Sequence, residues 1–131
     1  MFWPPNRRKL LSDKKLLGQW GEKRCEKFLK NKGLKKLVRN FSCKTGELDL
    51  VMVDTDSSIV FVEVKTRANE DFTDAESSIT SAKKHKLFKT ARYFLASNNI
   101  PDRPFRFDVV TVILGRSGRP QLRHYKNAFS A

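Results

Sequence analysis

Two apolar segments joined by a short polar linker constrain the fold of this chain more than any other feature. Residues 47–53 and 59–66 are rich in Val, Ile and Phe, which favour β-strands. The linker at 54–58 consists of Asp, Thr and Ser, which are common in turns. The pattern predicts a β-hairpin in which Asp54 pairs with Ser58 across a three-residue loop.

This register decides which side chains share a face of the hairpin, because side chains alternate along a strand. Asp49 is expected opposite Glu63 on one face. Glu47 and Lys65 form the next expected pair on that face. The other face is entirely apolar and is expected to pack beneath a helix. It carries Leu48, Leu50, Met52, Val60, Val62 and Val64.

The opposed carboxylates indicate a metal site. Side chains directly opposite each other across a hairpin have Cβ atoms about 5 Å apart. Asp49 and Glu63 would therefore repel each other without a cation between them. Hard cations such as Mg²⁺ prefer oxygen ligands and usually take one or two protein carboxylates. The sequence predicts Mg²⁺ or Mn²⁺ held by Asp49 and Glu63, with Lys65 placed to orient or activate a water molecule.

Alternatives stay open for these acidic residues. Asp49, Glu63 and Lys65 can be solvated charges at strand ends, with Glu47 and Lys65 an ordinary cross-strand ion pair. Glu22 lies at the margin of a predicted apolar helix stripe, where its carboxylate can lean over the sheet and help to hold a metal. A surface glutamate in a lysine-rich helix explains Glu22 equally well.

The rest of the chain alternates between helical and strand patterns. The order α-β-β-β-α-β-β predicts an α/β fold with a mixed central sheet flanked by helices. Residues 1–11 are expected to form a basic, flexible tail ahead of a single domain at 12–131. The other expected elements are a helix from Asp13 to Lys32 capped by Ser12, strands at 34–41, 105–114 and 121–126, a polar loop at 67–77 and a helix from Ile79 to Ser97.

Positive charge is concentrated at both ends of the chain. The formal net charge is +13, with +10 in residues 1–40, −6 in residues 41–76 and +9 in residues 77–131. Such an excess attracts polyanions, nucleic acid first and an anionic membrane second. The acidic middle suits a site that holds a cation against a phosphate. The candidates for phosphate contacts are Lys44, Arg67, Lys83, Lys84, Lys86, Lys89 and Arg92. The alternative is that the basic residues of the second helix are its solvated face.

Several other residues indicate structural roles or cellular context. Asp108 is expected to pair with Arg106, and the isolated residues His85 and His124 are expected at the surface. The two cysteines lack metal-site spacing and suggest reduced thiols in the cytoplasm. The sequence has no apolar run of about 18 residues and no secretory signal pattern, so no membrane partner is expected.

Linked motifs run in order from Gly18 to Phe129. They are Gly18-Gln19-Trp20-Gly21-Glu22, Gly46-Glu47-Leu48-Asp49-Leu50-Val51, Phe61-Val62-Glu63-Val64-Lys65-Thr66-Arg67, Lys83, Ala91 and Arg106-Phe107-Asp108-Val109-Val110. Together they resemble the YraN-like proteins, an uncharacterised bacterial family. That family is similar to the PD-(D/E)xK nuclease superfamily, which includes archaeal Holliday-junction resolvases.

The resemblance implies a restriction-endonuclease-like fold and a set of site roles. The roles are metal ligand for Asp49 and Glu63, catalytic lysine for Lys65 and helix-borne acid for Glu22. Leu48 stands where the superfamily has a proline. Cys25 stands where the family usually has a small alanine, which suggests packing and not reactivity.

Three functions are compatible with these patterns. The leading hypothesis is a Mg²⁺- or Mn²⁺-dependent nuclease that hydrolyses phosphodiester bonds in DNA, with branched DNA or repair intermediates as candidate substrates. The second is a nucleic-acid-binding protein that has a nuclease-like fold and does not cut. The third is a protein-interaction or ribosome-associated role, in which the basic surface meets RNA or an acidic partner. A homodimer is expected only by analogy with resolvases.

Overall fold

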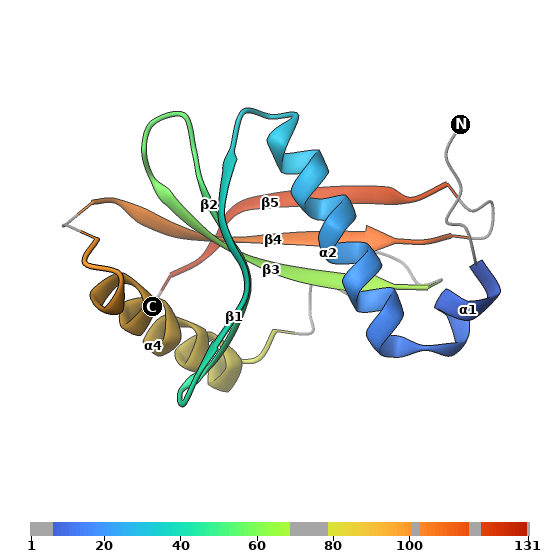
Figure 1. The fold of residues 1–131 in the computed structure, drawn as a ribbon, viewed down its shortest axis with the longest axis horizontal. Helices are drawn as coiled ribbons and strands as arrows, with labels where there is room; N and C mark the ends of the chain where they lie inside the picture. The colour runs from blue at the N-terminus through green and yellow to red at the C-terminus, as the bar shows by residue number, and fades with distance from the viewer. Residues whose placement is uncertain (1–6, 69–78, 101–102, 116–118, 131) are drawn as a thin grey trace.

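A computed structural model of the chain describes residues 7–68, 79–100, 103–115 and 119–130. The strands form one mixed sheet in the order β1-β2-β3-β4-β5 (Figure 1), in which β3 and β4 run parallel and the other neighbours antiparallel. The predicted α/β class and element order are confirmed. In chain order the elements are α1 (Arg7–Ser12), α2 (Lys14–Lys30), β1 (Lys35–Cys43), β2 (Gly46–Val53), β3 (Ile59–Arg67), α4 (Ser81–Ser97), β4 (Phe105–Ile113) and β5 (Gln121–Phe129).

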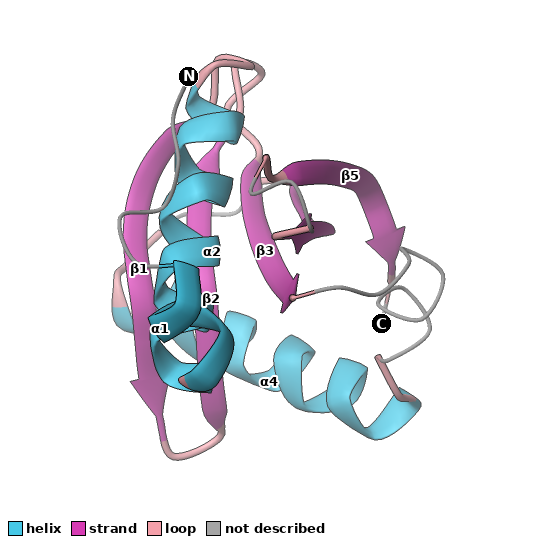
Figure 2. Cartoon of the chain, turned by 90° about the vertical axis from the view of Figure 1, so that its right-hand side faces the viewer, coloured by secondary structure: helices cyan, strands magenta, loops and turns pink. Residues whose placement is uncertain are grey.

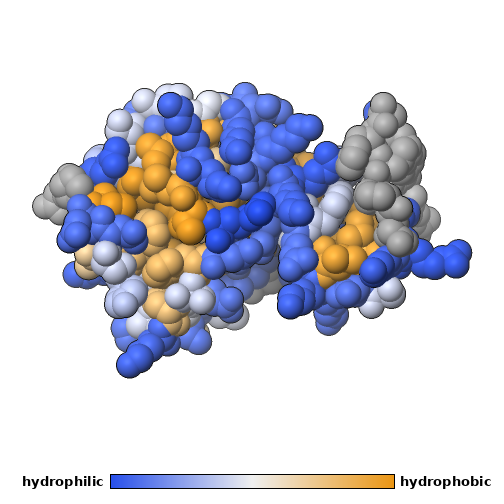
Figure 3. All heavy atoms as spheres, viewed as in Figure 1, coloured by the Kyte–Doolittle hydropathy of each residue, from blue (hydrophilic) through white to orange (hydrophobic). Residues whose placement is uncertain are grey.

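The two long helices cover opposite faces of the sheet (Figure 2). One apolar cluster joins α2 to Met52 and Val60, and the other joins α4 to Val51 and Phe61. Because successive side chains of a strand point to opposite faces, the two clusters lie on either side of the sheet. Hydrophilic side chains gather along the solvent side of α2 (Figure 3). Among the described helices, none is both long enough and apolar enough to cross a membrane.

The start of the chain differs from the sequence prediction in two ways. Residues 7–11, expected in a flexible tail, form the short helix α1 together with Ser12, and Leu10 of this helix is buried. The residue that caps α2 is Asp13 and not Ser12, because the Asp13 carboxylate accepts the backbone N–H groups of Lys15 and Leu16. The first six residues of the expected tail, and most of the expected loop at 67–77, lie outside the described residues.

The hairpin register near the turn is the one that the sequence predicts. The Asp54 N–H donates to the Ser58 carbonyl, and Val53 pairs with Ile59. Pairing between β2 and β3 then continues only as far as Leu50 and Val62. The expected pairs of Asp49 with Glu63 and of Glu47 with Lys65 are therefore wrong as ladder partners. Beyond that point β2 pairs only with β1, and β3 pairs only with β4, among the described strands.

The side that Leu48 faces is a second correction to the hairpin. Leu48 was expected on the same face as Leu50, but it packs with Val51 in the cluster beneath α4. Two residues three positions apart cannot share a face of a regular strand, so the alternation breaks between them. The break lies beside Asn40 of β1, which has a left-handed backbone with φ of 60°.

A close approach of α2 to β3 depends on Gly21. A Cβ atom at this position would overlap Oγ1 of Thr66 and would lie 2.7 Å from its Cγ2 and 2.8 Å from its Cβ. Rotation of the threonine side chain cannot remove the overlap, because its own Cβ is too close. The missing side chain of Gly21 therefore lets the helix settle on the sheet, and Glu22 follows directly in the helix.

Asp108 ties three parts of the chain together from the middle of β4. Its fully buried carboxylate accepts hydrogen bonds from Nε of Arg106 at 3.0 Å, Nε2 of His124 at 2.7 Å and the N–H of Asn127 at 2.9 Å. Arg106 also binds Asp54 at the β2–β3 turn. The expected pairing of Asp108 with Arg106 is confirmed. The expectation of a surface role for His124 is wrong, because its ring is held inward by Asp108.

Gly21→Ala is expected to lower the free energy of unfolding by about 1–3 kcal/mol, the usual cost of overpacking. Gly18→Ala is the matched control in the same helix, because a Cβ there meets nothing within 4 Å. It is expected to raise the free energy of unfolding by about 0.5–1 kcal/mol through helix propensity. Urea unfolding of both variants measures the difference. Equal stability of the two variants would show that α2 does not need this close approach.

Asp108→Asn is expected to lower the free energy of unfolding at pH 7 by about 3–5 kcal/mol, as when one partner of a buried ion pair is removed. Burial acts to raise the pKa of Asp108, but the hydrogen bonds from His124, Arg106 and Asn127 outweigh it and hold the pKa below the ordinary value of 3.8. The contribution is thus complete above that ordinary value and is lost as the pH falls below it. Unfolding of wild type and variant at a series of pH values tests this. A difference that stays constant into acid would contradict it.

Candidate active site

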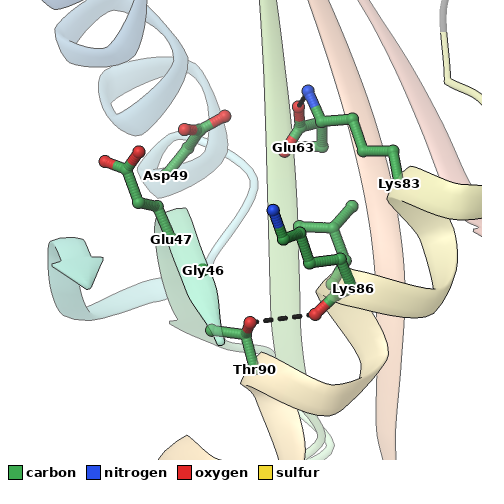
Figure 4. A pocket seen from close by; sticks show the side chains of 8 residues that line it. Gly46, Glu47, Asp49, Glu63, Lys83, Lys86 and Thr90 are labelled. Carbon is green, nitrogen blue, oxygen red and sulfur yellow. Dashed lines mark hydrogen bonds and ion pairs between the residues drawn. The ribbon is translucent and has the colours of Figure 1, made fainter. Parts of the chain in front are cut away.

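The separation of β2 from β3 opens a cavity between the two strands and α4. Its volume is about 220 Å³, and it is lined by Gly46, Glu47, Asp49, Glu63, Lys83, Lys86, Leu87 and Thr90. Figure 4 shows Glu47 and Asp49 on the β2 side, Glu63 on the β3 side, and the two lysines reaching in from α4. The structure therefore brings the two predicted metal ligands to one cavity although they are not paired in the ladder.

The side chain of Asp49 on β2 is held by a hydrogen bond from β3, although the two strands no longer pair at this position. Its Oδ2 atom accepts the backbone N–H of Val64 at 2.9 Å. Burial raises the pKa of Asp49 from the ordinary 3.8 to about 7, and the charges of Glu63 and Glu22 act in the same direction. The hydrogen bond from Val64 opposes this shift only in part. Ionisation of Asp49 therefore lowers the free energy of unfolding of the protein.

Glu63 is the carboxylate on which the positive charges converge. Its Oε2 atom lies 2.6 Å from Nζ of Lys83 and 3.5 Å from Nζ of Lys65. The Glu63 side chain is only 8% exposed, so both contacts are largely shielded from water. The predicted association of Lys65 with this site is consistent with the geometry. Lys83, predicted as a phosphate contact, contacts Glu63 directly.

Lys65 is unusually buried for a lysine. Its side chain is 10% exposed, and burial lowers its pKa below the ordinary value of 10.5. The neighbouring ammonium of Lys83 lowers the pKa further, whereas the charge of Glu63 opposes the change. An amine with a lowered pKa beside a carboxylate can exchange a proton near neutral pH more readily than a surface lysine can.

Glu22 on α2 lines a separate hollow together with Arg39 and Asn40 of β1. Burial raises its pKa above the ordinary 4.5, and the charges of Glu63 and Glu47 also raise it. A hydrogen bond with the side chain of Asn40 and the charge of Arg39 act in the opposite direction. Glu22 therefore does not line the acidic cavity, although the acids of the cavity act on its pKa.

The turn between β1 and β2 closes one side of the cavity. The hydroxyl of Thr45 lies 3.1 Å from that of Thr90 on α4, which donates to the Lys86 carbonyl at 2.9 Å. A Cβ atom on Gly46 would lie 3.0 Å from the Thr90 hydroxyl, and Gly46 has a φ of 148°. Glycine at this position therefore lets the turn lie against α4.

A wider basic groove adjoins the acidic cavity. It has a volume of about 690 Å³ and is lined by Lys44, Thr45, Ala82, Lys83, His85, Lys86 and Lys89. Lys83 and Lys86 line both spaces, so the groove leads directly to Glu63. The structure thus gathers Lys44, Lys83, Lys86 and Lys89, four of the predicted phosphate contacts.

The other predicted phosphate contacts lie outside this groove. Lys84 places its ammonium over the ring of Phe129, and Arg92 places its guanidinium over the ring of Phe88. Arg67 ends β3 and donates to the Thr66 carbonyl. His85, expected at the surface, lines the groove.

Sequence reasoning missed three contributors to the site. Glu47 was expected to pair with Lys65, but it is exposed and lines the acidic cavity. Asn40 was not singled out, although asparagine is one of the few residues that readily take a left-handed backbone. Thr90 was also missed, because its role depends on a turn 45 residues earlier in the chain. The signal available in the sequence was a threonine at a position of the helix where apolar residues are expected, and the structure shows that Thr90 is buried there.

The donor set fits a hard divalent cation bound by few protein groups. Asp49 and Glu63 offer carboxylate oxygens in one cavity, and both the charge of Glu63 and a side-chain hydrogen bond with it raise the pKa of Asp49. Among the described residues there is no group of three or more His, Cys, Asp or Glu side chains that could hold a metal ion. Mg²⁺ usually takes one or two protein carboxylates and keeps several waters, so two ligands suffice.

The structural class of this chain is an α/β protein with a mixed sheet, in which two acids and a buried lysine lie where two strands separate. The chain belongs to the uncharacterised protein family UPF0102, whose sequence profile matches residues 21–112. The resemblance seen in the sequence is thereby confirmed. The UPF0102 protein of Pelotomaculum thermopropionicum is 43% identical over 117 residues, 88% of this chain and 97% of that protein. The UPF0102 protein of Sulfurihydrogenibium sp. is 42% identical over 118 residues, 90% of this chain and 97% of that protein.

Solved structures share part of the backbone arrangement. A repair endonuclease from Pyrococcus abyssi is 24% identical and matches 56% of this chain and 27% of its own, with a TM-score of 0.30. SfsA from Pyrococcus furiosus, in complex with Ca²⁺, is 17% identical and matches 87% of this chain and 64% of its own, with a TM-score of 0.42.

Asp49→Asn is expected to stabilise the metal-free protein, because the amide keeps the hydrogen bond from Val64 and removes a disfavoured charge. The pKa of Asp49 is raised from 3.8 to about 7, so the penalty of ionisation grows across that interval and is complete above it. The gain is expected to reach about 1–3 kcal/mol above pH 7, allowing for partial relief by local rearrangement. Thermal and urea unfolding in EDTA measure it.

The matched control for this change is Glu47→Gln, which removes a charge from an exposed residue of the same cavity. Little change in stability is expected for it. A destabilised Asp49→Asn variant at pH 8 would refute the view that the carboxylate is held there at a cost.

Proposed function

We propose that this protein is a Mg²⁺- or Mn²⁺-dependent nuclease that hydrolyses phosphodiester bonds in DNA, with branched DNA or repair intermediates as its substrates. The observation that carries the proposal is the placement of Asp49 and Glu63 at one cavity, with Nζ of Lys65 3.5 Å from Oε2 of Glu63. Acids and a buried amine at the mouth of a basic groove are the groups that phosphodiester hydrolysis requires. The choice of DNA follows the resemblance of the sequence motifs to PD-(D/E)xK nucleases.

The carboxylates of Asp49 and Glu63 would hold the divalent cation. When bound there, such a cation supplies Lewis acidity and offsets negative charge on the phosphate. Lys65 is placed to orient the attacking water, because its ammonium is held 3.5 Å from Oε2 of Glu63. Lys86, which points into the cavity in Figure 4, offsets the charge that develops on the phosphate oxygens.

The groove beside the cavity supplies the binding surface for the nucleic-acid backbone. Lys44, Lys86 and Lys89 line it together with Lys83, so a phosphate chain would meet ammonium groups on both sides of the β1–β2 turn. Binding is therefore expected to weaken steeply with added salt. The tie between Thr45 and Thr90 holds the two walls of the groove together.

Glu63→Gln is expected to lower metal-stimulated cleavage by at least about a hundredfold, the usual loss when a main charge-stabilising group is removed. The test incubates branched, single-stranded and duplex DNA with the protein, with Mn²⁺, with Mg²⁺ and with EDTA. Circular dichroism checks that the variant is folded. Asp56→Asn is the matched control, because Asp56 is exposed at the turn end of the same hairpin. It is expected to leave cleavage unchanged.

The same experiment separates the proposal from a non-catalytic nucleic-acid-binding role. The ion pair of Lys83 with Glu63 favours that alternative, because it lets the fold neutralise its acid without a metal. Salt-sensitive DNA binding without metal-stimulated cleavage would establish the alternative. Equal cleavage by Glu63→Gln and wild type would remove Glu63 from the mechanism. Stronger binding of RNA than of DNA would overturn the choice of substrate.

A further inference from the structure

Two ammonium groups compete for one oxygen atom in the acidic cavity. Lys83 and Lys65 both contact Oε2 of Glu63, at 2.6 Å and 3.5 Å. An oxygen that already contacts two ammonium groups has little capacity left for a cation. A divalent metal that binds Glu63 through Oε2 must therefore displace at least one of the two amines.

The charge balance of the cavity leads to the same conclusion. Ionised Asp49 and Glu63 together carry the same amount of charge as Lys65 and Lys83, with opposite sign. A divalent cation added to this set would leave two uncompensated positive charges near largely buried groups. Uncompensated charge in such surroundings is costly. Departure of one ammonium group halves the excess, and an incoming phosphate reduces it further.

The exposure of the two lysines decides which one leaves. The Lys83 side chain is 42% exposed, whereas that of Lys65 is 10% exposed on an interior strand. Lys83 also lines the basic groove, so its ammonium can turn from the acidic cavity toward the groove without entering apolar surroundings. Its backbone is fixed meanwhile, because its N–H donates to Oγ1 of Thr80, the N-cap of α4.

The position of Lys83 in α4 is otherwise unfavourable. The first turn of this helix contains no acidic residue, although the helix macrodipole favours negative charge there. A lysine at this position loses the support that the helix would give to an acid. The ion pair with Glu63 compensates for the unfavourable position of Lys83 only while no other cation occupies the carboxylate.

We propose that Lys83 is a displaceable internal cation, which neutralises Glu63 in the metal-free protein and yields the carboxylate to a divalent metal. Its released ammonium then contacts a substrate phosphate in the adjoining groove. This inference rests on the proposed metal-dependent function and adds a role for one residue. Because the metal must displace Lys83, the affinity of the protein for the metal is lower than it would be without this lysine. Binding of a polyanion to the released ammonium is expected to raise that affinity.

The test measures binding of Mn²⁺ alone by isothermal titration calorimetry. Lys83→Met is expected to bind Mn²⁺ more tightly than wild type by roughly three- to tenfold, because loss of a partly exposed ion pair shifts an equilibrium by about that factor. The same variant is expected to bind duplex DNA more weakly in Mn²⁺. An unchanged or weakened affinity for Mn²⁺ would overturn the inference.

Lys86→Met is the matched control. Lys86 lines the same cavity and carries the same charge, but within the described part of the chain it forms no ion pair with Glu63. An equal gain in Mn²⁺ affinity for Lys86→Met would reveal a general loss of positive charge and would also overturn the inference. Absence of Mn²⁺ binding in every variant would refute the metal site itself. Tighter binding by Lys83→Met without cleavage would support the displacement while refuting the nuclease proposal.

A second measurement follows the ammonium group itself. Acetylation of wild-type protein by a water-soluble active ester, read by mass spectrometry, compares Lys83 with Lys86 in EDTA and in Mn²⁺. Lys83 is expected to become at least about twofold more reactive relative to Lys86 when Mn²⁺ is added, since its contact with Glu63 is lost. A constant ratio would contradict displacement.

Discussion

Two carboxylates that lie close together on separating strands organise the centre of this molecule. Like charges directly opposite each other destabilise a strand pair, and β2 and β3 stop pairing just before Asp49 and Glu63 would meet. The N–H of Val64 donates to the Asp49 carboxylate. The space gained by this separation admits Lys83 and Lys86 from α4. The cavity, its buried acids and its covering lysines are thus consequences of one interrupted ladder.

The parts of the fold that follow from local pattern were predictable. Alternation of side chains and a short turn sufficed to pair Val53 with Ile59 and to place Val51 and Phe61 on one face. The element order followed from the same periodicities, because each element buries one face against a neighbour. The expectation that Cys25 serves packing is also correct, since it is fully buried and burial raises the pKa of its thiol.

The parts that failed depend on contacts between distant segments. A period of two assumes that a strand stays regular, so it could not place Leu48 beneath α4 after the break beside Asn40. Nor could an isolated His124 reveal that Asp108 would hold its ring. The pairing of Asp49 with Glu63 failed for a related reason, because the ladder between β2 and β3 ends at Leu50 and Val62. The two acids still line one cavity, since the ends of separating strands remain close.

The lysines of α4 show why such a site can exist in a stable fold. A buried acid without a partner would weaken the protein, and a permanent partner would deny the acid to any ligand. Lys83 meets both requirements, because it contacts Glu63 closely yet keeps much of its side chain in water. Lys65 lacks that freedom, since it is enclosed on β3. Two lysines on one carboxylate therefore differ in what they can do: the enclosed amine stays with the acid, and the exposed amine can exchange it for a phosphate.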